Sequence, residues 1–226
     1  MNVFLTGTDT GVGKTFVASL LVRAGRRAGF GTVGFKPICC GDRDDAEALH
    51  AAAEGALELN LINPVWLRTP AAPYVASMIE NRAIDLTLIR ESFRRIRALH
   101  GSVIVEGVGG WRVPIERDYF ASDLAAEFAL PIAVVVPNRL GAINHTLLTV
   151  ETIRAQGLQC AGLILNESAP PDEAQAIAAA TNAGILEELT HLPVLFRVDH
   201  EQRGLQLSEA ALTRLMGGPT PANNGT

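Results

Sequence analysis

The sequence predicts a single α/β domain whose mainly parallel sheet carries helices on both faces. Short apolar runs alternate with segments of helical periodicity along most of the 226 residues, which is the pattern of a parallel α/β fold. Two of the runs, residues 102–106 and 131–137, are continuously apolar, as are strands buried on both faces of such a sheet. The length fits one domain better than two, because chains usually divide only beyond about 250–300 residues.

The first expected elements surround a glycine-rich stretch. Residues 2–6 (NVFLT) form a short apolar run that ends at a glycine, and they predict a strand. Residues 14–28 carry apolar side chains at helical spacing, and glycines end that pattern. Residues 32–36 (TVGFK) predict a second strand, which a proline stops. The alanine-rich residues 44–54 predict the next helix.

The rest of the chain continues the alternation after one irregular stretch. Prolines interrupt residues 63–77, so we expect an irregular segment there with room for one strand. Residues 85–99 predict a helix, because their apolar residues fall on one stripe with arginines opposite. After the two apolar strands we expect helix 144–156, strand 160–166, helix 172–183, strand 193–196 and helix 208–216. The domain then spans residues 1–216, and residues 217–226, which have little to bury, are expected to be a disordered tail.

Composition and charge argue against several classes of protein. The chain has 19 basic and 24 acidic residues, a net charge of −5, whereas nucleic-acid-binding proteins normally show a basic face. No apolar run reaches the roughly 18–20 residues that span a bilayer. Three cysteines, two of them adjacent, provide neither a disulfide framework nor zinc-ligand spacing. We therefore expect a cytoplasmic protein without nucleic-acid or membrane partners.

The segment GTDTGVGKT, between the first strand and the first helix, predicts a phosphate-binding loop. The strict pattern G-x-x-x-x-G-K-[ST] requires glycine at position 8, where this chain has Thr8, so the loop is a lengthened variant. Gly11 and Gly13 allow backbone N–H groups to converge on phosphate oxygens at a helix N-terminus. Lys14 is expected to reach the β- and γ-phosphates, and the Thr15 hydroxyl to bind Mg²⁺. A ligand-free glycine turn is the alternative, and nucleotide binding is favoured.

Charged residues follow two further predicted strands. Glu106 ends one apolar strand, where a Mg²⁺-binding acid normally lies, and Lys36 ends the second strand. Asp44 and Asp45 come shortly after it. Because the carboxyl ends of parallel strands meet at one edge, we expect Lys14 to lie close to these groups. A solvated surface lysine is the alternative for Lys36. The combination predicts a P-loop NTPase-like fold.

Five motifs occur in order across most of residues 2–171. They are TGTDTGVGKT (6–15), GFKP (34–37), VEGVGGW (105–111), LGAINHTLLT (140–149), and LN followed by PP (165–171). Together they resemble the dethiobiotin synthetase family, the ATP-dependent ligases of biotin biosynthesis. The first and third motifs form a specific combination, although either alone is a moderate signal.

The resemblance implies an ATP- and Mg²⁺-dependent reaction in three stages. One amine of 7,8-diaminopelargonic acid takes up CO₂ to give a carbamate, which ATP phosphorylates. The second amine then attacks the carbamic–phosphoric anhydride and closes the ureido ring of dethiobiotin, with release of phosphate. Because the anhydride is reactive, the pocket must position the second amine and exclude water.

The resemblance also implies a role for each matching residue. The catalytic residues, around the carbamate and the γ-phosphate, are Lys14, Lys36 and Thr10. The residues that bind ATP and its phosphates are Asp9, Thr10, Gly11, Val12, Gly13, Lys14, Thr15 and Asn166. The substrate-binding residues are Lys36, Cys40, Glu106, Gly107, Gly109, Leu140, Gly141 and Asn144. The Mg²⁺ ligands are Thr15, Asp45 and Glu106, with Asp44 as the adjacent alternative to Asp45.

Some of these positions keep an alternative interpretation or depart from the family pattern. Asn166, the implied adenine reader, is otherwise an ordinary strand-end turn residue. Residues 140–145 are implied to bind the substrate carboxylate across a homodimer interface, although His145 fits a capping role equally well. Cys40 stands where the family commonly has serine. Phe196 and Asp199 replace a glycine and a proline beside the expected adenine pocket.

Two other functions fit the same fold. A nucleotide-dependent regulatory ATPase would act through a protein partner and would not consume a small diamine. Amide-forming chemistry on cobyrinic acid normally requires a glutamine-hydrolysing domain, for which 226 residues leave no room. The ligase is the favoured reading.

Overall fold

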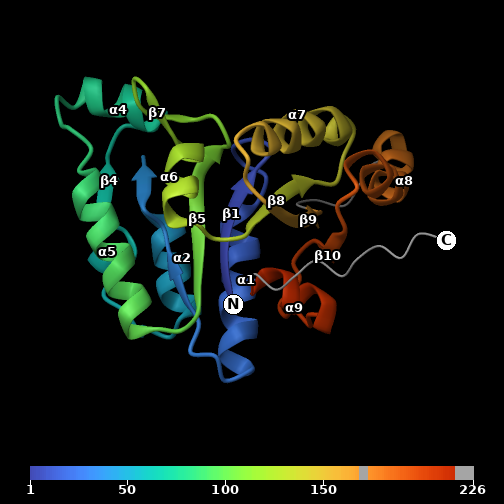
Figure 1. Cartoon of the computed structure of the whole chain (residues 1–226), viewed down its shortest axis with the longest axis horizontal. Coiled ribbons are helices and arrows are strands. Elements are labelled where there is room, and N and C mark those ends of the chain that lie inside the picture. Colours follow the sequence, from blue (N-terminus) through green and yellow to red (C-terminus); the bar gives the residue numbers. More distant parts are fainter. Residues whose placement is uncertain (168–172, 217–226) are drawn as a thin grey trace.

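Six parallel strands form the central sheet of the computed structural model, which describes residues 1–167 and 173–216 (Figure 1). The strands are β1 (Asn2–Gly7), β2 (Val33–Phe35), β5 (Val103–Gly110), β8 (Ile132–Pro137), β9 (Cys160–Asn166) and β10 (Val194–Val198). Their order across the sheet is β10-β9-β8-β1-β5-β2, and every neighbouring pair is parallel. The mainly parallel sheet predicted from the sequence is confirmed.

The larger helices and the C-terminal α9 cover both faces of this sheet. They are α1 (Lys14–Arg27), α2 (Asp44–Ala52), α5 (Leu86–Leu99), α6 (Ala121–Phe128), α7 (Ala142–Ala155), α8 (Glu173–Thr190) and α9 (Glu209–Leu215). The connection through α1 runs from β1 toward β2, whereas those through α6, α7 and α8 run toward β10. Right-handed crossovers that run in opposite directions place their helices on opposite faces. The predicted two-sided cover is therefore confirmed.

Several short elements add to the predicted set. β3 (Ile38–Cys40) pairs in parallel with β4 (Val65–Leu67), and β6 (Pro114–Glu116) pairs antiparallel with β7 (Tyr119–Phe120). The remaining helices are α3 (Leu59–Ile62) and α4 (Pro73–Ile79), and α6, between β5 and β8, was likewise not predicted.

The irregular segment expected over 63–77 is therefore wrong at its end, where α4 forms. Proline is favoured at the first position of a helix because its missing N–H would have no partner there. The strand for which the prediction left room is β4.

The other differences from the predicted ranges concern element ends. Asp85 and Ser208 were expected inside helices, but each caps one: Asp85 Oδ1 accepts from Leu88 N at 2.8 Å and Ser208 Oγ from Ala211 N at 3.2 Å. The helix expected over 172–183 extends to Thr190. Residue 172 and the tail expected over 217–226 lie outside the described residues.

Four phenylalanines bind the sheet to α5 and α6. Phe4 and Phe35 come from strands, and Phe93 and Phe128 from these helices. The rings of Phe93 and Phe128 stack with centroids 4.0 Å apart, and Phe128 also lies 6.4 Å from Phe4 and 6.1 Å from Phe35. Such aromatic pairs contribute beyond the apolar area they bury. In the described part of the chain, no helix has both the length and the hydropathy needed to cross a membrane.

We expect Phe128→Ala to lower the free energy of unfolding by about 3–5 kcal/mol, because it empties a buried ring position that three other rings contact. Urea denaturation measures the loss. Leu99→Ala, at a position 61% exposed on α5, is the control and should change stability by less than about 0.5 kcal/mol. Equal effects from the two substitutions would contradict this account of the core.

Candidate functional site

The loop between β1 and α1 has the backbone shape that phosphate binding requires. Gly11 has φ 73° and Gly13, the residue that precedes α1, has φ 89°, so both occupy the left-handed region that favours glycine. A Cβ atom on Gly13 would lie 2.1 Å from Nδ2 of Asn166. The N-terminal N–H groups of α1 are thus presented at the end of a glycine turn, as anion binding requires.

The Lys14 ammonium lies against this loop. Its side chain is buried, and Nζ donates to the backbone carbonyl of Asp9 at 3.1 Å. Burial, and after it the charge of Lys36, lowers the pKa of Lys14 to about 8. The lysine therefore still carries its charge at pH 7, in a site that solvent screens weakly.

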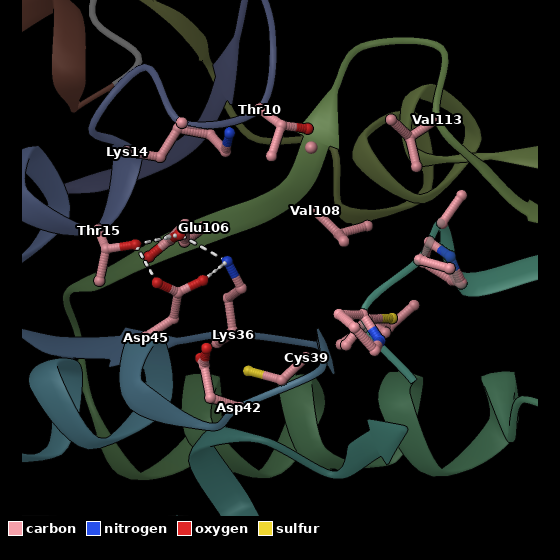
Figure 2. Close-up of a pocket in the computed structure, with 18 of the residues that line it drawn as sticks. Thr10, Lys14, Thr15, Lys36, Cys39, Asp42, Asp45, Glu106, Val108 and Val113 are labelled. Carbon is pink, nitrogen blue, oxygen red and sulfur yellow. Dashed lines mark hydrogen bonds and ion pairs between the residues drawn. The ribbon is translucent and has the colours of Figure 1, made fainter. Parts of the chain in front are cut away.

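The strand register brings Lys36 next to Glu106. β2 pairs with β5 so that Phe35 faces Val105, which puts the following residue of each strand at the same level of the sheet. Lys36 Nζ then donates to Glu106 Oε1 at 2.6 Å and to Asp45 Oδ2 at 2.6 Å (Figure 2). Lys36 is 3% exposed and Glu106 is 1% exposed.

These contacts set the charge state of the cluster. Burial alone would lower the pKa of Lys36, but the charges of Glu106 and Asp45 outweigh burial and raise it well above its usual range. Burial would likewise raise the pKa of Asp45, and the Lys36 ammonium outweighs this and lowers it. Lys36 and Asp45 are therefore an ammonium and a carboxylate in contact at neutral pH.

Thr15 completes a set of oxygen atoms suited to a hard cation. Its Oγ1 lies 2.5 Å from Asp45 Oδ1 and 2.8 Å from Glu106 Oε1. One hydroxyl proton serves only one of these acceptors at a time. Glu106 Oε2 is buried and accepts no hydrogen bond from any described residue. Mg²⁺ prefers such hard oxygen ligands, so the donor set fits this ion.

Two further observations bear on the metal ligands. Among residues 1–167 and 173–216, no three His, Cys, Asp or Glu side chains are grouped so that they could hold a metal ion. The set described here consists of two carboxylates and one hydroxyl. Of the two aspartates that the sequence left open, Asp45 reaches the cluster, whereas Asp44 is exposed. The geometry thus favours Asp45 over Asp44.

A cavity of about 660 Å³ opens over these groups. The predicted site residues that line it are Thr10, Gly11, Gly13, Lys14, Thr15, Lys36, Cys40, Asp45, Glu106 and Gly109. Figure 2 shows Lys14 on one side of the cavity and Val108 and Val113 toward the other side, with Thr10 between them. The cationic end of the cavity therefore faces a partly apolar wall.

Sequence reasoning did not predict this wall. The lining residues that it missed are Ile38, Cys39, Asp42, Pro70, Ala71, Ala72, Pro73, Val108 and Val113. The signal for Val108 was its place inside the VEGVGGW motif, directly after the carboxylate. Burial raises the pKa of Cys39 to about 12 and that of Cys40 to about 11, so both thiols stay neutral at physiological pH.

Four predicted residues, Asp9, Val12, Gly107 and Asn166, do not line the cavity. Asn166 is 2% exposed, and its Nδ2 donates to the carbonyl of Val12 at 2.9 Å. Its Oδ1 is buried and accepts no hydrogen bond from any described residue. Asp9 accepts from Thr10 N at 2.7 Å. Gly107 packs against the ring of Phe4. Asn166 thus supports the phosphate loop here, and its reading of adenine stays a prediction.

The last three predicted residues lie at the start of α7. Leu140, Gly141 and Asn144 are exposed, and none of them lines the cavity within this one chain. Gly141 precedes α7 with φ 90°. Their contact with substrate stays a prediction that requires a second copy of the chain.

Sequence comparison finds relatives of this chain that share one name, ATP-dependent dethiobiotin synthetase BioD. A family model described as an AAA domain matches residues 1–203. An ATP-dependent dethiobiotin synthetase BioD from Akkermansia muciniphila is 45% identical over 201 residues, which is 89% of this chain and 93% of that protein. A protein of the same name from Aromatoleum aromaticum is 42% identical over 222 residues, 95% of this chain and 97% of that protein.

Solved structures of low sequence identity share the fold. A ParA family ATPase from Chlorobium tepidum superposes with a TM-score of 0.53 at 14% identity, over 97% of this chain and 90% of that one. The septum site-determining protein MinD of Pyrococcus horikoshii, solved with Mg-ADP, gives 0.53 at 13% identity, over 88% and 81%. At this identity the likeness concerns the fold alone, and it agrees with the predicted P-loop NTPase-like fold.

We expect Lys36→Met to lower the free energy of unfolding at pH 7 by about 3–5 kcal/mol, because it leaves the buried Glu106 beside Asp45 without a cation. Urea denaturation measures the loss. Lys36 depresses the pKa of Asp45, so this part of the stability is present above the ordinary aspartate pKa of 3.8 and is lost as the pH falls below it.

The double variant Lys36→Met/Glu106→Gln is the matched control, since it removes both buried charges and should recover much of the stability. A loss of less than about 1 kcal/mol in the single variant at pH 7 would show that the pair is not effectively buried.

Proposed function

This chain belongs to the ATP-dependent dethiobiotin synthetase family, and from that premise we propose that it carboxylates 7,8-diaminopelargonic acid with CO₂ and closes the ureido ring, using ATP and Mg²⁺. The observation that carries the proposal is the buried Lys36 ammonium, which contacts Glu106 and Asp45 in the cavity that the phosphate loop also lines. A diamine whose carbamate must be phosphorylated needs that combination of charges in one cavity.

The two lysines stabilise the phosphoryl group as it moves from ATP to the carbamate. Lys14 and Lys36 both line the cavity, and after burial the charge of Lys36 lowers the pKa of Lys14. Fixed cations in a site of low dielectric lower the energy of the charge that develops in the transition state. Thr10, on the same edge of the cavity, adds a hydroxyl donor.

Thr15, Asp45 and Glu106 would hold Mg²⁺, which supplies charge neutralisation for the β- and γ-phosphate oxygens when it is bound. The oxygen chemistry of this set and the unused Oε2 of Glu106 support the assignment. The same carboxylate oxygen has the acceptor capacity to take a hydrogen bond from an amine of the substrate.

The apolar wall orients the diamine and keeps water from the anhydride. Ile38, Val108 and Val113 line the cavity, and Figure 2 shows the two valines on the side away from Lys14. A hydrocarbon chain in contact with these side chains is removed from water. Holding the second amine near the anhydride favours ring closure, since an intramolecular attack then competes with hydrolysis.

The substrate carboxylate binds at the start of α7 of a second copy of the chain. Leu140 is 77% exposed. Ala142 N donates to the carbonyl of Arg139 at 3.2 Å, and the next two N–H groups of α7 have no helical carbonyl to bind. A helix N-terminus favours anions. We therefore propose a homodimer, acting in the cytoplasm on small molecules, in which each site takes residues from both subunits.

Turnover with the purified protein tests the proposed reaction. With ATP, Mg²⁺, bicarbonate and 7,8-diaminopelargonic acid, we expect phosphate release that depends on the diamine, and a product with the mass of the ureido compound. A folded sample that hydrolyses ATP only with a protein partner, and without diamine stimulation, would instead support the regulatory ATPase.

We expect Lys14→Ala and Lys36→Ala each to reduce that turnover about 100-fold or more, because each removes a cation beside the transferring phosphoryl group. Circular dichroism controls for folding. A folded Lys36→Ala variant that turns over at the wild-type rate would remove Lys36 from the mechanism.

We also expect ATP affinity in the absence of diamine to fall about tenfold between pH 7 and pH 9. Burial lowers the pKa of Lys14 to about 8, so the free protein loses this charge across that interval and binds the anionic nucleotide less well. Isothermal titration calorimetry measures the affinity. Lys14→Met should bind ATP more weakly and without this pH dependence, and an unchanged slope in this variant would assign the titration to another group.

A further inference from the structure

One buried side chain outside the cavity joins the two segments that carry Lys36 and Asp45. Asn63 is 1% exposed, and its Nδ2 donates to the carbonyl of Lys36 and to that of Val65, both at 2.9 Å. Its Oδ1 accepts from Arg43 Nε at 2.9 Å. Both N–H groups of the amide are thus in use, which fixes its orientation.

Arg43, the residue that Asn63 Oδ1 contacts, lies at the start of α2. Arg43 is the residue that precedes α2, and its carbonyl accepts from the N–H groups of Ala46 at 3.0 Å and Glu47 at 3.1 Å. Its guanidinium also donates to the carbonyl of Asn63 at 2.7 Å. Because Asp45 is the second residue of α2, a shift of Arg43 would move the backbone that carries the Asp45 carboxylate.

Hydrogen bonds hold both the N–H and the carbonyl of the Lys36 backbone. Lys36 N donates to the carbonyl of Ile62 at 2.9 Å, and the carbonyl of Lys36 accepts from Asn63. Trp66 supports the Arg43 segment, since its Nε1 donates to the carbonyl of Gly41 at 2.9 Å and its ring lies 5.3 Å from the guanidinium. The sequence motifs include none of Arg43, Asn63 and Trp66.

We propose that Asn63 is a positioning residue that sets the separation of the Lys36 ammonium and the Asp45 carboxylate through Arg43. The inference rests on the proposed function, in which these two groups act on the phosphoryl group and on Mg²⁺. A displacement of about 1 Å at a reacting group can reduce a rate about 100-fold, so loss of this connection should be visible in kcat. The phosphate loop makes none of these contacts, so ATP binding should change little.

Asn63→Ala and Ser102→Ala form a matched pair. Ser102 is also buried and also makes three side-chain hydrogen bonds, to Met1 N, Met1 O and Thr32 Oγ1, but it precedes β5 at the opposite edge of the sheet from the cavity. Both substitutions should lower Tm. Only Asn63→Ala should lower kcat, by at least tenfold, with KM for ATP within about threefold of the wild type.

A binding measurement separates this inference from the proposed reaction. Mn²⁺ titration with ADP present, followed by electron paramagnetic resonance, needs no diamine turnover. We expect Asn63→Ala to bind Mn²⁺ about tenfold more weakly than the wild type and Ser102→Ala to bind it equally. If the wild type shows no diamine-dependent turnover, the proposed function fails while this difference in Mn²⁺ affinity still tests the positioning role.

Arg43→Ala covers the case in which Asn63→Ala does not fold, because it leaves the Asn63 contact to Lys36 in place. It should lower kcat and Mn²⁺ affinity severalfold, whereas Asn60→Ala, which removes only an exposed contact to the same guanidinium, should change neither. A folded Asn63→Ala or Arg43→Ala variant with wild-type kcat and Mn²⁺ affinity, or an equal loss of kcat in Ser102→Ala, would overturn the proposal.

Discussion

The buried contact between the Lys36 ammonium and the Glu106 carboxylate is the constraint on which the site depends. A carboxylate with 1% exposure is costly to keep ionised unless a cation is close, and Lys36 Nζ lies 2.6 Å away. Asp45 also contacts the Lys36 ammonium, but its side chain is partly exposed to solvent. The cluster therefore combines a charge held in low dielectric with one that a ligand can approach, which suits the binding of a metal–nucleotide complex.

The sheet topology explains how three distant segments meet there. β5 lies between β1 and β2, so the loop after β1, the residue after β2 and Glu106 within β5 all reach the same edge. Asp45 joins them from the start of α2, which packs against β2 and α1. Lys14 and Asp45 lie at the start of helices, Lys36 follows β2, and Glu106 lies within β5, so none of them lies within a long loop. The charges are thus held by backbone pairing, with Asn63 and Arg43 as the side-chain link between two of the segments.

Sequence reasoning found what periodicity and motifs encode. The six apolar strands, the larger helices other than α6, and the convergence of Lys14, Lys36 and Glu106 follow from local pattern and from the rule that parallel strands end at one edge. It missed α4, because prolines at an irregular stretch also start helices, and β3, because Pro37 interrupts the extended chain without ending it. The apolar cavity wall could not be predicted from the sequence, because it is formed by segments around residues 38, 70–73 and 108–113 that only tertiary packing brings together. The choice between Asp44 and Asp45 likewise required geometry.

A crystal structure of the protein with a non-hydrolysable ATP analogue, Mg²⁺ and the diamine tests the central claim most directly. The account predicts Mg²⁺ within bonding distance of the oxygens of Thr15, Asp45 and Glu106, and Lys36 Nζ within hydrogen-bonding distance of the γ-phosphate or the substrate carbamate. A metal bound elsewhere, with Lys36 in contact with no ligand atom, would contradict it.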